Sequence, residues 1–108
     1  MYYEEFKKIK NPTKKQCLEV LSEEHEIDCV KKSWEIMPKK FTDSESFVEQ
    51  ALITNSIVIL CLENPTDHQI EDAIVEDAFL VQYFNWDSKT DLLKRIKEKT
   101  TEVNFFLK

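Results

Sequence analysis

The chain has 108 residues, which suits one domain with a modest core and is too short for a separate lid or cofactor domain. Its composition, 42% hydrophobic and 33% charged, is that of a folded protein, and no apolar run reaches the roughly 18–20 residues of a membrane span. The formal net charge of −6 disfavours direct nucleic-acid binding, and the complete absence of glycine excludes phosphate-binding loops, dinucleotide-binding turns and nucleophile elbows. We therefore expect one helical, cytoplasmic domain over residues 1–108.

The N-terminal part begins with a short helix candidate at residues 2–10 and continues with a patterned unit. Asn11-Pro12-Thr13 opens this unit, since Pro is tolerated in a first helical turn. Counted from Thr13, apolar residues fall at offsets +4, +7, +8, +14 and +17, which predicts a helix, a turn and a second short helix. These residues are Cys17, Val20, Leu21, Ile27 and Val30.

The same pattern recurs three more times. After an insertion at residues 31–41, where Pro38 prevents one helix from running through, units start at Ser44, Thr66 and Ser88. The four starts are thus spaced 31, 22 and 22 residues apart. We expect an all-α fold of four stacked helical hairpins of about 22 residues, a short α-solenoid with an N-terminal helix.

Two features of the units concern their turns and second halves. Residues 56–62 have the composition of a buried strand when taken alone, but their place in the repeat and the lack of glycine turns favour helix. Offset +11 is Asn55 in the second unit and Asp77 in the third. We expect these two residues to end the preceding helices in the left-handed conformation.

The units resemble the short helical repeats of the DUF4116 type, which occur in bacterial, phage and giant-virus proteins. The likeness rests on Asn11-Pro12-Thr13 with Cys17-Leu18, and on Asn64-Pro65-Thr66 with Ala73-Ile74, within residues 11–108. The chain departs from the family pattern by lacking the turn glycine and by its insertion. The resemblance implies an α-helical repeat array without catalytic residues.

Charge is distributed unevenly along the chain. From Phe41 to Asp87 there are ten acidic residues and no Lys or Arg, whereas residues 88–108 carry six bases and three acids. Offsets +1 and +5 lie outside the apolar stripe, so we expect the acids there to form an exposed ridge. The ridge is either a solvated face or a docking surface for a basic partner, and Trp86 is either a cap over the core or a partner anchor. The predicted partner-binding residues are Glu45, Glu49, Asp67, Glu71, Asp72, Glu76 and Trp86.

Residues that could support chemistry are few. The cysteines Cys17, Cys29 and Cys61 are odd in number and form no C-x-x-C pair, so we expect reduced, buried thiols. Neither His25 nor His68 has neighbours that suggest zinc binding. We expect no catalytic residue, no metal site and no cofactor.

These features together predict a non-catalytic protein-binding module whose acidic ridge engages a basic partner surface. The size and acidity of the chain, together with the occurrence of the resembled family in phage proteins, suggest a phage or mobile-element inhibitor of a host defence protein or nuclease. Two alternatives stay open. One is a nucleotide- or metabolite-sequestering protein that uses Lys94, Arg95 and Lys97; the other is a structural subunit that self-associates through Trp34, Phe105 and Phe106.

Overall fold

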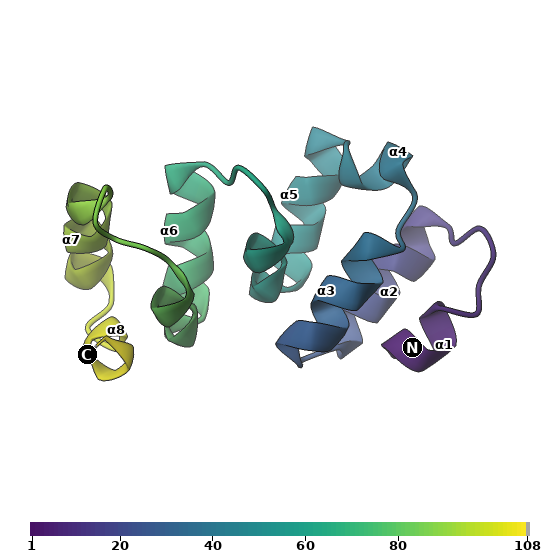
Figure 1. Cartoon of the computed structure of the whole chain (residues 1–108), viewed down its shortest axis with the longest axis horizontal. Coiled ribbons are helices and arrows are strands. Elements are labelled where there is room, and N and C mark those ends of the chain that lie inside the picture. The colour runs from purple at the N-terminus through teal and green to yellow at the C-terminus, as the bar shows by residue number, and fades with distance from the viewer. Residues whose placement is uncertain (108) are drawn as a thin grey trace. The chain divides into compact units, whose positions relative to one another are not determined.

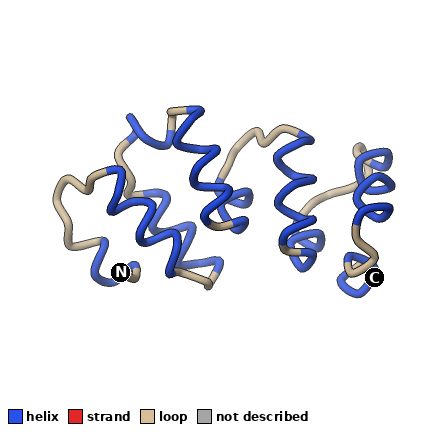
Figure 2. Tube along the Cα trace, turned by 180° about the vertical axis from the view of Figure 1, so that it is seen from behind, coloured by secondary structure: helices blue, strands red, loops and turns tan. Residues whose placement is uncertain are grey.

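The chain is all-α, as its sequence predicts. The computed structural model describes residues 1–107, and these contain helices, turns and loops but no strand (Figure 2). None of the helices in this range is long and apolar enough to cross a membrane. The backbone divides into two compact units, Met1–Cys61 and Leu62–Lys108, which are described separately.

The first unit contains five α-helices and one 3-10 helix (Figure 1). They are α1 (Tyr3–Phe6), α2 (Lys14–Glu23), α3 (Ile27–Glu35), α4 (Lys39–Thr42), α5 (Glu45–Thr54) and η1 (Ser56–Cys61). Helix α2 packs against α5, and α3 packs against η1. The residues between them that are least exposed include Cys17, Val20, Leu21, Val30, Phe47 and Val58. Cys17, Val20, Leu21 and Val30 are four of the five apolar offsets counted from Thr13, and the fifth, Ile27, is only half-buried.

The second unit contains two ten-residue α-helices, a 3-10 helix and a short terminal helix. They are α6 (Asp67–Glu76), η2 (Ala78–Tyr83), α7 (Thr90–Lys99) and α8 (Val103–Phe106). Its core is formed by Ile70, Ile74, Leu80, Val81, Leu92, Ile96 and Val103. Helix α6 packs against α7 and η2, and α8 packs against η2. The N-cap of the last long helix is Lys89, one residue after the predicted start at Ser88, and the helix begins at Thr90.

The predicted helix starts at Thr13, Ser44 and Thr66 are confirmed by their capping bonds. Thr13 Oγ1 accepts from the Gln16 amide at 3.2 Å, and the Gln16 side chain accepts from the Thr13 amide at 2.9 Å. Thr66 and Gln69 make the same reciprocal pair at 3.1 and 2.9 Å. Each pair satisfies two backbone donors that a helix N-terminus would otherwise leave open.

Residues 56–61 form a helix and not a strand, as predicted. The segment is a 3-10 helix in which Ile57, Val58 and Ile59 are all buried. Three consecutive buried side chains cannot lie on one face of an exposed strand or α-helix. The strand-like composition therefore reflects burial on most sides of a short helix.

The left-handed conformation expected at Asn55 and Asp77 is wrong. Asn55 has φ −154° and ψ 112°, Asp77 has φ −134° and ψ 90°, and no residue of the described chain has a positive φ. Both residues are extended, while their amides still donate to the carbonyl oxygens of Ala51 and Ala73. An extended residue turns the chain directly into the following 3-10 helix, so no glycine is needed.

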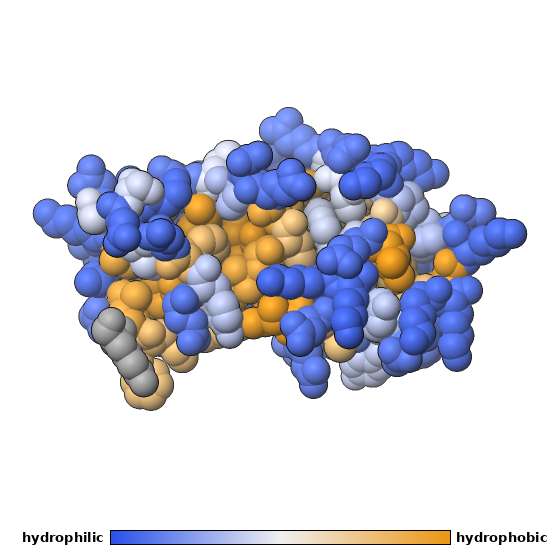
Figure 3. All heavy atoms as spheres, in the orientation of Figure 1, coloured by the Kyte–Doolittle hydropathy of each residue, from blue (hydrophilic) through white to orange (hydrophobic). Residues whose placement is uncertain are grey.

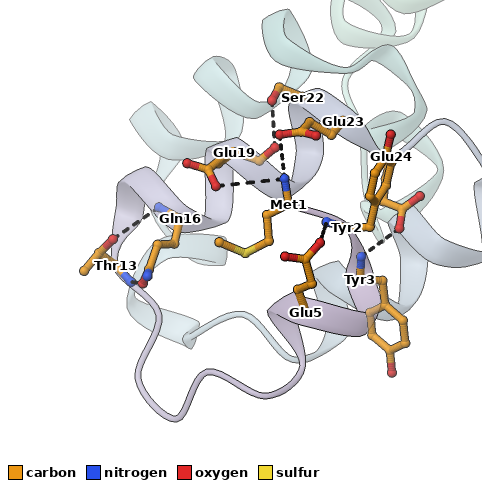
Figure 4. A network of polar contacts seen from close by, with 10 residues as sticks. All are labelled: Met1, Tyr2, Tyr3, Glu5, Thr13, Gln16, Glu19, Ser22, Glu23 and Glu24. Atoms are coloured by element: carbon orange, nitrogen blue, oxygen red, sulfur yellow. Dashed lines mark hydrogen bonds and ion pairs between the residues drawn. The ribbon is translucent and has the colours of Figure 1, made fainter.

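Polar bonds anchor the beginning of the chain to the end of α2 (Figure 4). The Met1 amino group lies 2.5 Å from Glu23 Oε1, and the Tyr3 amide donates to Glu24 Oε2 at 2.8 Å. Glu24 is buried, so its carboxylate needs such a donor. The carbonyl of Glu24 accepts a bond from Asn55 Nδ2 at 2.8 Å, which links α2 to the α5–η1 turn.

Candidate acidic docking surface

The acids of α6 are partly engaged by bases from α7. Lys89 Nζ lies 2.7 Å from Asp67 Oδ1, and Arg95 Nε lies 2.7 Å from Glu71 Oε1. Lys99 Nζ pairs with the other carboxylate oxygen of Glu71. All three ion pairs connect α6 to α7 or to Lys89, the residue before α7, within the second unit. The basic C-terminal stretch of the sequence therefore neutralises acids of its own neighbour.

Glu71 is the acid that departs furthest from expectation. Its residue is only 4% exposed, so its predicted place on an exposed ridge is wrong. The hydrogen bonds from Lys99 and Arg95 hold the pKa of Glu71 below its ordinary value of 4.5, because they favour the charged form. Offset +5 does lie outside the apolar stripe of α6, but α7 covers it.

The other predicted acids of α6 remain at the surface. Asp67 is exposed despite its bond to Lys89, and Asp72 and Glu76 are exposed as well. His68 Nε2 lies 3.2 Å from Asp72 Oδ2, one helical turn away. Glu76 has no ion-pair partner among residues 1–107. Asp72 and Glu76 are thus the acids of α6 that no Lys or Arg of the described chain neutralises.

Helix α5 of the first unit carries two exposed acids. Glu45 and Glu49 are exposed, and neither forms an ion pair with any residue that the structure describes. Ser44 caps this helix by accepting from the Phe47 amide at 3.4 Å, which fixes the register of both glutamates. One turn beyond Glu49 lies Ile53, whose side chain is left 88% exposed. Sequence analysis did not single out Ile53, although its spacing from Glu49 indicates the same face.

Trp86 is half-buried and its polar atom is satisfied inside the second unit. Its indole Nε1 donates to the Val81 carbonyl at 2.9 Å, and its ring lies 5.8 Å from that of Phe84. These contacts match a cap over the core, and they leave part of the ring at the surface. Phe105 on α8 is 82% exposed, and Figure 3 shows hydrophobic side chains at this end of the unit.

The thiols are all free, as expected, but only Cys17 is fully buried; Cys29 and Cys61 are half-buried. Burial raises the pKa of Cys17 to about 11 and that of Cys61 to about 12. Residues 1–107 contain no group of three or more His, Cys, Asp or Glu side chains placed to hold a metal ion. Of the bases considered for a ligand pocket, Arg95 is engaged by Glu71.

No protein-family model, curated protein or solved structure matches this chain.

Proposed function

We propose that the protein is a non-catalytic protein-binding module whose exposed acids engage a basic surface on a partner. The observation that carries this proposal is the state of α5, where Glu45 and Glu49 are exposed and have no base opposite them among the described residues. In the second unit, Asp72 and Glu76 on α6 are exposed and likewise have no Lys or Arg partner among the described residues. Between Phe41 and Asp87 the sequence offers no Lys or Arg that could neutralise these acids.

A field of this sign speeds the approach of a basic partner and weakens as salt screens it. Proteins that bind nucleic acids carry basic faces for phosphate contacts, and such faces fit an acidic surface. A host nuclease or defence protein is accordingly the partner class that we propose, with the chain acting as a phage or mobile-element inhibitor. This extension rests on the resemblance to DUF4116-type repeats.

We also propose that the helices form a short array of repeated hairpins. The four leading helices α2, α5, α6 and α7 each have ten residues. Each is followed within four residues by a shorter helix. This regularity supports the repeat interpretation, whose stacking a structure of the chain in solution would test.

The experiment that tests the binding function is affinity capture from a host-type lysate at low and high salt. The informative variant reverses the unpaired acids: Glu45→Lys, Glu49→Lys, Asp72→Lys and Glu76→Lys. We expect the wild type to retain a basic protein at low salt and release it at high salt, and the variant to retain none. Retention of the same proteins by the variant would overturn the proposal.

A control variant must change the net charge equally without touching α5 or α6. Four exposed acids elsewhere serve this purpose: Glu26, Glu35, Glu98 and Glu102. Their reversal to Lys should leave capture intact if the partner recognises a surface rather than net charge. Asp67 and Glu71 are kept unchanged in both variants, since reversing them would break the ion pairs between α6 and α7.

A further inference from the structure

Helices α5 and α6 carry the same three-residue stripe along one face. Positions 1, 5 and 9 are Glu45, Glu49 and Ile53 in α5, and Asp67, Glu71 and Val75 in α6. Residues four apart on a helix are neighbours on its surface, so each stripe is a continuous line of two carboxylates and one apolar side chain. The shared spacing allows the surroundings of the two stripes to be compared directly.

The two carboxylates of the α6 stripe form ion pairs with a basic helix and the residue before it. Helices α6 and α7 lie side by side in the second unit (Figures 1 and 2). Helix α7 and the residue before it supply Lys89 to Asp67, and Arg95 and Lys99 to Glu71. Leu92 and Ile96 of the same basic helix are buried. The structure therefore contains one case in which the two carboxylates of this stripe are bound by a basic amphipathic helix, while the apolar member of the stripe, Val75, stays 41% exposed.

The α5 stripe has no ion-pair partner in the described chain. Both of its glutamates are exposed and unpaired in the described chain, and Ile53 is 88% exposed against 41% for Val75. The next long helix in the sequence cannot supply the missing bases. Where α7 and its flank have Lys89, Arg95 and Lys99, the equivalent positions of α6 are Thr66, Asp72 and Glu76. A base for Glu45 and Glu49 must come from outside this part of the chain.

We infer that the stripe Glu45–Glu49–Ile53 is the docking site for a basic amphipathic helix of the partner protein. The partner helix carries Lys or Arg at the spacing of residues 89, 95 and 99, and an apolar side chain that covers Ile53. This inference rests on the proposed function and names the partner element that the acidic surface accepts. Buried apolar contact at Ile53 would add specificity that charge alone does not give.

The probe for this site is a synthetic peptide with the sequence of residues 87–101, which contains the three pairing bases and both buried apolar residues of α7. It is added to the full-length, isotope-labelled protein while backbone amide resonances are recorded. We expect the resonances of α5 to move and those of α6 and α7 to stay. Binding should weaken at least about tenfold between low and high salt, since exposed ion pairs are screened.

Three variants and one altered peptide sharpen the result. Glu45→Lys with Glu49→Lys should abolish peptide binding, and Ile53→Asn should weaken it several-fold. Because these side chains are exposed and unpaired, the variants should keep the wild-type fold, as checked by circular dichroism. A matched control, Glu35→Lys with Glu98→Lys, should bind as the wild type does. A peptide with Lys89, Arg95 and Lys99 replaced by Glu should not bind.

Each contrary result overturns the inference. Equal binding by the Glu45→Lys, Glu49→Lys variant, or no movement of α5 resonances at saturating peptide, would show that the stripe is not a helix site. Movement of α6 and α7 resonances alone would show that the peptide only displaces α7. Movement of α5 resonances on concentrating the protein without peptide would identify a second copy as the occupant. If capture from lysate still depends on the four unpaired acids, the proposed function survives any of these failures.

Discussion

Nε of Arg95 lies 2.7 Å from Oε1 of Glu71, and Lys99 pairs with the second oxygen of the same carboxylate. This relationship removes Glu71 from the surface that its sequence position suggests. It also engages two of the five bases that the sequence places in residues 88–107. The acidic surface that remains open is therefore defined as much by where α7 lies as by where the acids occur.

Replacing Glu71 by Gln should destabilise the second unit. The substitution removes the charge that both bases bond, and the side chain it alters is only 5% exposed. Arg95 and Lys99 are about half exposed, so water can hydrate them once the carboxylate is gone. The free energy of unfolding should therefore fall by only about 1–2 kcal/mol. Urea denaturation measures the change in the free energy of unfolding, and amide hydrogen exchange shows whether α7 is affected.

The matched control for this substitution is Glu76→Gln on the same helix. Glu76 is exposed and has no ion pair in the described chain, so its change should stay within about 0.5 kcal/mol. Equal effects of the two substitutions would contradict the role given to the bonds from α7.

The stability contributed by Glu71 should depend on pH in one direction. Its pKa is lower in the folded protein than its ordinary value of 4.5, because Lys99 and Arg95 favour the carboxylate. A group with a lowered folded pKa stabilises fully above its unfolded value and loses that contribution as pH falls through the folded value. The stability difference between wild type and Glu71→Gln should therefore be constant near neutrality and shrink below about pH 4.5. A difference that grows on acidification would contradict this assignment.

Asn55→Ala should destabilise the first unit more than an ordinary surface substitution. Its Nδ2 donates to the carbonyls of Leu21 and Glu24 at 2.9 and 2.8 Å, and its Oδ1 accepts from the Ile57 amide at 3.0 Å. Loss of these bonds at a half-buried position should cost about 1–3 kcal/mol. Asn55→Asp keeps the acceptor but loses both donors, so it should be nearly as harmful. Denaturant unfolding measures the stability of both variants, with Asn104→Ala at an exposed site as the control. A loss no larger than that of the control would contradict the role given to Asn55.

The thiols should differ in reactivity in the folded protein. With pKa values of about 11 and about 12, Cys17 and Cys61 hold roughly a thousandth or less of their thiol as thiolate at pH 8. Half-buried Cys29 should react first with a thiol reagent, and Cys29→Ser should remove that fast phase. All three should react at similar rates in denaturant. A fast phase that persists in Cys29→Ser would contradict the burial assigned to the other two.

Local features of the fold were predictable because they depend on near neighbours in the sequence. The capping pairs of Thr13 with Gln16 and of Thr66 with Gln69 span three residues, and most apolar offsets within the ten-residue helices mark buried residues. The helical state of residues 56–61 also followed from the repeat pattern. The start of α7 was misplaced by one residue because Ser88 is a residue type that often caps helices but makes no capping bond, and Lys89 is the N-cap instead.

The features that could not be predicted depend on distant partners. Glu71 is buried by residues 24 and 28 positions later, and nothing near it in the sequence indicates this. A comparison of charges between successive units, Glu71 with Arg95 and Lys99, would have been the available signal. Asn55 was expected to be left-handed because Asn tolerates that conformation at a helix end. The expectation failed because Asn55 bonds to Leu21 and Glu24, which lie 34 and 31 residues away in the sequence. Those bonds hold it in an extended conformation.

The central claim is that Glu45 and Glu49 on α5 are the unpaired counterparts of the two α6 carboxylates that are paired with Lys89 and α7. Side-chain carboxyl resonances, recorded by carbon-13 NMR while the peptide of residues 87–101 is added, test it most directly. The account predicts that the resonances of Glu45 and Glu49 move together and saturate, while that of Glu71 stays where it is. Movement of the Glu71 resonance with no change at Glu45 and Glu49 would contradict the claim, since the peptide would then bind the α6 carboxylate and not those of α5.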